Sequence, residues 1–220
     1  MSALAFLGVD GDASPARSPL ADQAAAAGAR FETRDGWEIA VYGDLAEERR
    51  AYRETVAWVD MSHLRKLELQ GAPEQLSAFG ATVRDDAADA ALGTATRVGE
   101  GWWCPITSSK AFLLGSRPDA VDAVSMVDVT ASYGALTLAG PLARETFARF
   151  CALDLRDQAT PVGAFRPGSV ARTPGFVLRE GEDRFLMLFG AAYGAYMWQV
   201  VADAATRLGG RPAGVEALDA

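Results

Sequence analysis

The sequence is short of the residue types that most often build metal and redox sites. It contains one histidine, His63, and two cysteines, Cys104 and Cys151, among 220 residues. Two cysteines are too few for a disulfide framework, and their spacing does not match a metal motif. A structural zinc site needs four ligands of the His, Cys or carboxylate type. We therefore expect no metal site and no disulfide scaffold, and a reducing, cytoplasmic setting.

Long apolar runs and an excess of positive charge are also missing. The chain carries 21 Lys and Arg against 29 Asp and Glu, which gives a formal net charge of −8. Such a surface repels phosphates and anionic lipids, so we expect neither nucleic acid nor membrane as a partner. No apolar run approaches the roughly 20 residues that span a bilayer. The opening "MSALAFLGVDGD" has no basic start and too short an apolar segment for a secretory signal.

What is present is an ordinary globular composition with a hydrophobic share of 50%. Residues 1–18 are small, polar and interrupted by Pro and Gly, which predicts a flexible tail before a module over 19–220. The first part of that module predicts a helix over 19–31 that ends at Gly28, a strand over 36–43, and a helix over 44–59.

The rest of the chain contains one pattern twice. Each copy predicts a strand, a helix, two strands of a hairpin and a second helix, the order of a ferredoxin-like split βαβ unit. The first copy has these elements at 65–71, 72–83, 101–106, 110–115 and 117–126, and the second at 134–140, 141–153, 175–179, 184–189 and 191–208.

Matching residues support the repeat. Leu67 and Leu69 correspond to Leu136 and Leu138 at an offset of 69, and Phe112-Leu113-Leu114 corresponds to Phe185-Leu186-Met187 at an offset of 73. We predict an α+β fold of two pseudo-symmetric units, approximately 65–130 and 131–210, with a crevice for a small molecule between them.

The amino-terminal part resembles the aminomethyltransferase family, that is, the glycine cleavage T-protein and folate-dependent demethylases. The matching elements are Ser18-Pro19-Leu20, Gly28–Phe31, Gly36-Trp37-Glu38, the helix around 47–52, and Asp60-Met61-Ser62-His63 followed by Lys66. The stretch "GALTLAGPLARETFARFCALDL" is similar to the same family and to the gamma subunit of heterotetrameric sarcosine oxidase. The final "GRPAGVEALD" resembles the family's junction into a C-terminal barrel, which is absent here.

This resemblance implies a T-protein-like folate-binding module. Tetrahydrofolate would lie between the two units and receive an aminomethyl or methyl group. The residues that the resemblance places around this ligand are Met61, Leu64, Trp103, Cys104, Arg179 and Leu186.

Several of these positions depart from the family pattern. Its acidic residues are replaced by Cys104 and Pro105, its tyrosine before the hairpin turn by Arg179, and its pterin-binding glutamate by Leu186. A leucine cannot accept the paired donors of a pterin edge, and each buried unpaired donor costs about 1–3 kcal/mol. The resemblance therefore implies a degenerate or repurposed pocket.

The catalytic candidates are His63, Asp86 and Cys104, and each also has a structural interpretation. His63 either lines the pocket or bonds the backbone at a turn, and no Ser–His–Asp arrangement supports it. Cys104 is either a nucleophile or an inert buried thiol, since no cation near it in sequence would lower its pKa. Asp86 either serves the site or lies in a solvated acidic loop.

Two classes of function remain open, and the sequence favours the first, a transferase-family pocket that still binds a ligand. One is a one-carbon transferase with an altered pocket, which the well-kept section from Gly36 to Lys66 favours. The other is a non-catalytic, gamma-like subunit of a flavin- and folate-dependent oxidase complex, which the short chain and the lost acid favour. Either a homo-oligomer or larger oxidase subunits would then be partners. A crevice filled by side chains would instead indicate a ligand-free structural protein.

Overall fold

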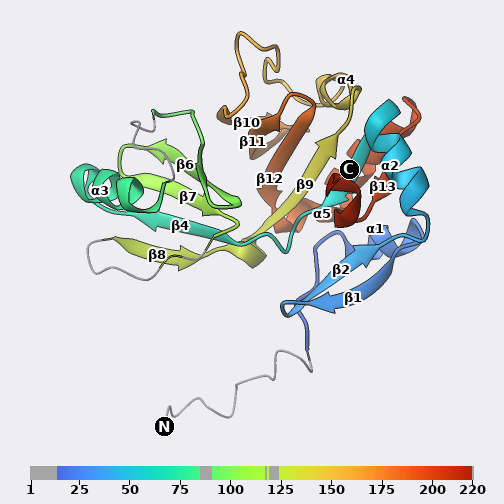
Figure 1. Ribbon diagram of the computed structural model, residues 1–220, viewed down its shortest axis with the longest axis horizontal. Helices are drawn as coiled ribbons and strands as arrows, with labels where there is room; N and C mark the ends of the chain where they lie inside the picture. Colours follow the sequence, from blue (N-terminus) through green and yellow to red (C-terminus); the bar gives the residue numbers. More distant parts are fainter. Residues whose placement is uncertain (1–13, 85–90, 117, 119–123, 220) are drawn as a thin grey trace.

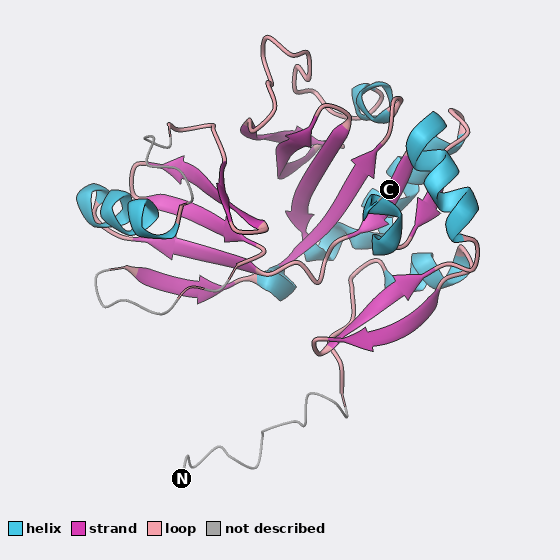
Figure 2. Cartoon of the chain, viewed as in Figure 1, coloured by secondary structure: helices cyan, strands magenta, loops and turns pink. Residues whose placement is uncertain are grey.

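The computed structural model describes residues 14–84, 91–116, 118 and 124–219. The chain forms a two-stranded hairpin followed by two open sheets, one of five and one of six strands (Figure 1). Helices lie on the outer sides of these sheets (Figure 2), and the two sheets meet through a shared apolar cluster. Neither sheet closes into a barrel within the described residues. No described helix is long and apolar enough to cross a membrane.

The five-stranded sheet has the order β5-β6-β7-β4-β8, and all its neighbours are antiparallel. Its strands are β4 (Lys66–Gln70), β5 (Thr96–Val98), β6 (Gly101–Thr107), β7 (Lys110–Leu114) and β8 (Ser125–Asp128). The helix α3 (Pro73–Val83) covers the outer face, where Leu76 and Phe79 pack in one cluster with Leu67 and Trp103. Without the edge strand β5, this is the strand order of a ferredoxin-like unit.

The six-stranded sheet repeats that order with one insertion. Its order is β10-β11-β12-β9-β3-β13. The strands are β3 (Ala57–Asp60), β9 (Tyr133–Ala139), β10 (Phe165–Val170), β11 (Thr173–Gly181), β12 (Arg184–Gly190) and β13 (Arg211–Ala213). Strand β3 comes from before the first unit and lies between β9, its antiparallel neighbour, and β13, its parallel neighbour. The helices α4 (Ala143–Ala148) and α5 (Gly194–Thr206) pack on the outer face.

The register of the two sheets corrects the predicted repeat by one residue. Glu68 of β4 pairs with Phe112, whereas Thr137, its counterpart in β9, pairs with Leu186. The hairpin offset is therefore 74 residues rather than 73, and Phe112 corresponds to Leu186. A slip of one residue turns every side chain to the opposite face of a strand.

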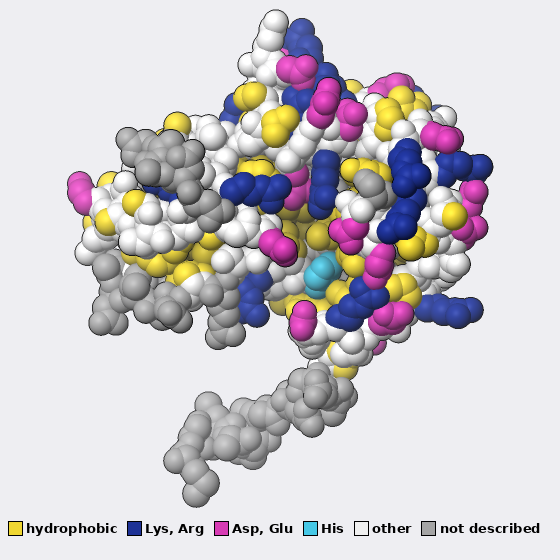
Figure 3. Space-filling model, viewed as in Figure 1, with side chains coloured by type: hydrophobic (Ala, Val, Ile, Leu, Met, Phe, Trp, Pro, Cys, Tyr) yellow, Lys and Arg dark blue, Asp and Glu magenta, His cyan; other side chains and the backbone are white. Residues whose placement is uncertain are grey.

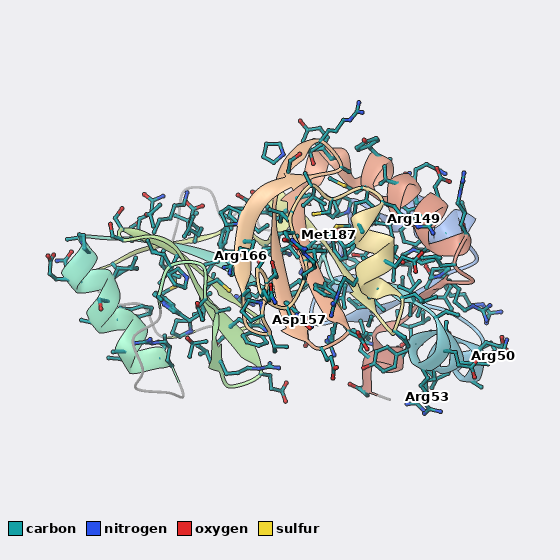
Figure 4. The ribbon with its side chains drawn as sticks, turned by 90° about the horizontal axis from the view of Figure 1, so that it is seen from above. Arg50, Arg53, Arg149, Asp157, Arg166 and Met187 are labelled. Carbon is teal, nitrogen blue, oxygen red and sulfur yellow. The ribbon has the colours of Figure 1, made fainter. Side chains whose placement is uncertain are left out.

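This register decides which side chains lie between the sheets. Phe112 and Leu186 point into an inter-sheet cluster, while Met187 packs toward the helices on the outer face of its sheet (Figure 4). We define the inter-sheet cluster by its buried members, Ala95, Trp102, Cys104, Phe112, Leu114, Ala135, Phe165, Leu178, Leu186 and Leu188.

The amino-terminal hairpin pairs β1 (Arg30–Arg34) with β2 (Trp37–Val41) through the two-residue turn Asp35-Gly36. Both turn residues have positive φ, 50° and 76°, as this tight turn requires. Before it, α1 (Ala21–Ala26) ends ahead of Gly28. Residues 1–13 of the predicted tail lie outside the described residues, and Ala16 forms a parallel bridge with Trp37.

Three predicted helices differ from the structure. The helix predicted over 44–59 ends early: α2 spans Leu45–Glu54, with Arg50 and Arg53 on its outer side (Figure 4), and 57–60 form β3. The buried run from Val56 to Val59 pairs with β9, and this pairing overrides the helical pattern. The helix predicted over 141–153 is reduced to α4. Residues 117 and 119–123 of the helix predicted over 117–126 lie outside the described residues, and 125–126 belong to β8.

Candidate functional site

The segment from Asp60 to Lys66 carries the chain from the six-stranded sheet to the five-stranded sheet. The Asp60 carboxylate accepts a hydrogen bond from the Ser62 backbone N–H at 2.9 Å. The buried Ser62 hydroxyl oxygen in turn accepts from the Ala135 N–H of β9 at 3.1 Å. Two backbone bonds, from Met61 N–H to the Ala135 carbonyl and from Leu64 N–H to the Met61 carbonyl, complete the turn. The Asp-Met-Ser-His motif is thus fixed by its own polar groups.

Lys66 stabilises this crossing through buried hydrogen bonds. Its side chain is 0% exposed, and Nζ donates to the Ser62 carbonyl at 2.9 Å and to the Leu64 carbonyl at 2.8 Å. Burial lowers the pKa of Lys66 to about 8, although the charges of Asp60 and Asp128 oppose this shift. Lys66 therefore acts as a positioning residue for the residues that precede it.

A second crossing, from β8 to β9, is tied to the first. The Lys66 backbone N–H donates to the Thr130 hydroxyl at 3.0 Å, and the Val129 N–H donates to the Lys66 carbonyl at 2.9 Å. Thr130 is itself held by a bond from its N–H to the Asp128 carboxylate at 2.9 Å. The two crossings therefore fix the relative position of the two sheets.

His63 and Leu64 lie on the wall of an open pocket of about 610 Å³. The pocket lies between the β1–β2 turn, the 60–66 crossing and the β5–β6 turn, and its lining includes Arg34, Asp35, Trp37, His63, Leu64 and Glu100. Figure 3 shows the histidine in a hollow beside acidic and basic side chains. We call this the His63 pocket. Its mixed charges suit a polar ligand better than an apolar one.

The electrostatics of His63 favour a neutral ring. Burial lowers its pKa as the largest cause, the Asp60 charge opposes this, and Lys66 and Arg34 add to the lowering. Within the part of the chain that the structure describes, the ring has no hydrogen-bonding side-chain partner that would orient it as a general base. The position of His63 is consistent with a structural role in the pocket wall.

Cys104 and Leu186 lie elsewhere, in the inter-sheet cluster. They are 0% and 1% exposed, and their surroundings are apolar. Phe112 fills the centre, with ring centroids of Phe165 at 6.4 Å and Phe176 at 5.3 Å. Burial raises the pKa of the Cys104 thiol well above its ordinary value, with a smaller contribution from Glu180. A thiol in this setting remains protonated and is a poor nucleophile.

Trp103 and Arg179 are separated from both places. Trp103 faces α3, where its ring centroid lies 6.1 Å from that of Phe79. The Arg179 guanidinium is buried and donates to the Asp157 carboxylate at 2.6 Å and to the Thr160 and Glu182 carbonyls. These hydrogen bonds hold the β11–β12 turn against the preceding loop, so the Arg179 donors are used within the protein and are not available to a ligand.

Of the remaining predicted residues, Met61 is half-buried and packs at the edge of the inter-sheet cluster, and Asp86 lies outside the described residues. The structure thus brings together His63 with Leu64, and Cys104 with Leu186 and Met61. Leu64 belongs to both groups, because it lines the pocket and also packs against the inter-sheet cluster. Reasoning from the sequence missed the polar pocket residues Arg34, Asp35 and Glu100, because they come from three distant turns. The described residues hold no group of three or more His, Cys, Asp or Glu that could bind a metal.

Comparison with known families gives one match over just over half of the chain. Residues 107–220 match the sequence model of the GCVT N-terminal domain. Among curated proteins, the chain is 26% identical to the aminomethyltransferase of Symbiobacterium thermophilum over 233 residues, 92% of this chain and 62% of that protein. It is 27% identical to that of Saccharopolyspora erythraea over 242 residues, again with 62% of that protein covered. The chain therefore spans about three fifths of the length of these relatives.

Solved structures share the fold. A chain of the heterotetrameric sarcosine oxidase from Corynebacterium sp. U-96, in complex with pyrrole 2-carboxylate, matches with a TM-score of 0.67 and 21% identity, covering 88% of this chain and 96% of that chain. The glycine cleavage system aminomethyltransferase T from Bartonella henselae matches with a TM-score of 0.74 and 17% identity, covering 94% and 61%. Both confirm the predicted α+β fold class.

Proposed function

The chain belongs to the GCVT N-terminal domain family, and from this premise we propose that it is a non-catalytic, gamma-like subunit of a sarcosine oxidase-type complex. The inter-sheet cluster carries the non-catalytic part of the proposal, and the likeness to a sarcosine oxidase chain favours a subunit over a structural protein outside any complex. The space in which a small ligand was expected between the two units contains the buried aromatic and aliphatic side chains around Phe112.

The residues in that space do not fit a pterin. Cys104 and Leu186 stand in this space where the family resemblance implies carboxylates, and both are buried. Pro105, the other replaced acidic position, is buried on the opposite face of β6, beside Trp103 and α3. A pterin brought into the inter-sheet space would lose its hydrogen bonds to water and gain none from Cys104 and Leu186. It would also have to displace Phe112 and Leu186, which pack at the centre of the cluster.

A second observation supports a subunit role. A chain of a heterotetrameric sarcosine oxidase has the same fold, with a TM-score of 0.67. A module that holds its two units together by a packed cluster is suited to present a fixed surface to larger chains.

Calorimetric titration of the purified chain with tetrahydrofolate tests the loss of the ligand. We expect no saturable heat at millimolar tetrahydrofolate, while a full-length aminomethyltransferase titrated in parallel gives a normal isotherm. Saturable micromolar binding that Phe112→Ala weakens would contradict the proposal, because the ligand would then use the space between the sheets.

Purification from native cells tests the subunit role. A tag on the chromosomal copy, followed by gentle purification and light scattering on a sizing column, gives the mass of the assembly. We expect stoichiometric larger chains and flavin absorbance in the same peak. A tagged chain that elutes alone, or only as a homo-oligomer without flavin, would refute this role.

A second candidate function is a one-carbon transferase with a repurposed pocket. The observation in its favour is that two predicted site residues, His63 and Leu64, line one open pocket beside Asp35 and Glu100. The test is transfer of an aminomethyl carbon to tetrahydrofolate, measured as methylenetetrahydrofolate. Turnover that falls in His63→Ala and is kept in a variant of an exposed residue away from the pocket, such as Gln158→Ala, would favour this function over the first.

A further inference from the structure

A second pocket shares Arg34 with the His63 pocket. It is bounded by the β1–β2 hairpin, the first turn of α2 and the 3₁₀ helix η4 (Val215–Asp219), and it encloses about 660 Å³. None of the residues predicted for the folate site lines it. We call it the Glu48 pocket, after the acidic residue of α2 in its wall.

Glu48 is a buried carboxylate that the protein satisfies only in part. The residue is 3% exposed, and its Oε2 accepts a hydrogen bond from the Gly214 N–H at 2.8 Å. Its Oε1 is buried and has no hydrogen-bond partner among the described residues. Glu48 also takes part in no ion pair among the salt bridges of the described chain, in contrast to its neighbour Glu47, which binds Arg50 and Arg211. Buried polar groups are normally paired, so this oxygen points to a missing donor.

The rest of the pocket lining consists mainly of charged and aromatic side chains. Arg34 binds both Glu32 and Glu216, which neutralises much of their charge and closes one side of the pocket. Burial, with the charges of Asp60 and Glu48, raises the pKa of the Tyr42 phenol, so its hydroxyl stays protonated and can donate. The ring of Phe31 lies in the same wall.

The charges of the lining favour a ligand with one positive charge. Three carboxylates, Glu32, Glu48 and Glu216, face two guanidinium groups, Arg30 and Arg34. Arg34 pairs with both Glu32 and Glu216, and Glu48 is the lining carboxylate without an ion pair among the described residues. Aromatic rings beside it stabilise organic cations as well. A metal ion is a poor match, since no cluster of three or more ligating side chains exists in the described residues.

We propose that the Glu48 pocket binds a small organic ammonium ion, a primary or secondary amine that donates an N–H to Oε1 of Glu48 with its carbon substituents against Phe31 and Tyr42. This site is separate from the inter-sheet space and does not depend on the subunit role proposed above.

Ligand-observed proton NMR tests this assignment on the full chain at constant ionic strength. The probes are methylammonium and dimethylammonium chloride, with tetramethylammonium as a cation that has no N–H to donate. We expect saturable binding of the first two and at least tenfold weaker binding of the third. Glu48→Gln keeps an acceptor for the Gly214 N–H but removes the charge, and it should weaken binding at least tenfold.

Glu47→Gln is the matched control on the same helix and should bind as the wild type does. If Glu48→Gln does not fold, Leu45→Lys takes its place, because Leu45 is 38% exposed at the pocket rim and a lysine there repels the ligand. The proposal is overturned if the wild type shows no saturable binding, if Glu48→Gln or a folded Leu45→Lys binds as well as Glu47→Gln, or if tetramethylammonium binds equally.

Discussion

Replacement of Leu186 by glutamate separates a packed inter-sheet core from an open ligand pocket. The family resemblance implies a pterin-binding carboxylate at this position, so an open pocket would accept the glutamate and gain affinity for folate. The structure instead places Leu186 at 1% exposure in the inter-sheet cluster with Cys104, Phe112 and Leu178. We therefore expect Leu186→Glu to destabilise the fold and to restore no folate binding.

The expected loss follows from two contributions. The shorter apolar part of glutamate loses about 1–2 kcal/mol of the burial free energy of leucine. A fully buried glutamate has a pKa of about 8–9 against about 4.3 in the unfolded chain, so it folds in its protonated form. Protonation at pH 7 costs about 4 kcal/mol, at 1.36 kcal/mol per pH unit above the unfolded value. The sum, about 5–6 kcal/mol, is comparable with the whole stability of many domains.

The pH dependence gives this prediction its sign. Because the folded pKa is raised, the native state binds more protons than the unfolded state between about pH 4.3 and 8, and the stability of the variant falls as pH rises. The loss relative to wild type should therefore shrink by about 3 kcal/mol from pH 7 to pH 5. Leu186→Gln buries a polar group that does not titrate, so its loss should be the same at both values.

Urea unfolding followed by tryptophan fluorescence, at pH 5 and pH 7, measures all three proteins. Trp102 and Trp103 lie in or beside the clusters at stake and report their exposure. A Leu186→Glu variant that loses less than about 1 kcal/mol, with no dependence on pH, would refute a dry packed core. Gain of tetrahydrofolate binding in the same variant would refute the proposed function as well.

Three further predictions rest on other buried groups. Burial lowers the pKa of Lys66 to about 8 in the native state, so the unfolded chain binds more protons than the native state between pH 8 and 10.5. The stability of the wild type relative to Lys66→Met should therefore rise by about 3 kcal/mol over that range. A difference in urea midpoints that does not change with pH would show that Lys66 is solvated. Arg179→Lys cannot reproduce the bonds to Asp157 and three backbone carbonyls, so it should cost about 3–5 kcal/mol in the same assay. The more exposed Arg144→Lys should cost less than about 1 kcal/mol, and equal losses would contradict a buried role for Arg179. In the native protein a thiol reagent should modify Cys151 slowly and Cys104 only after unfolding. Mass spectrometry of a Cys151→Ser variant measures the labelling of Cys104 alone, and fast labelling would disprove the burial of Cys104.

The sequence by itself determined the fold class and the repeat. Alternating apolar residues mark β4 and β9 as strands, short continuous apolar runs mark β7 and β12, and Pro73 with the apolar face behind it marks α3. These signals depend only on neighbours along the chain. The motif from Asp60 to Lys66 was visible for the same reason, since the side chains of Asp60 and Lys66 bond within their own segment. The family membership follows from these local patterns and from the residues that match the family.

Only the tertiary structure decided what lies between the two units. The family resemblance implied a carboxylate at the position of Leu186. It did not imply that Leu186 shares a filled space with Phe112, because one residue of register, set by pairing with Thr137, determines the face of the strand on which Leu186 lies. The sequence pattern over β3 predicts a helix, and only its pairing with β9 and β13 makes this segment a strand. Both pockets likewise bring together segments that are far apart in the chain. In the Glu48 pocket, for example, Glu48 accepts a hydrogen bond from the N–H of Gly214. Local periodicity cannot encode which distant backbone supplies the partner, and that choice separates a packed core from a binding site.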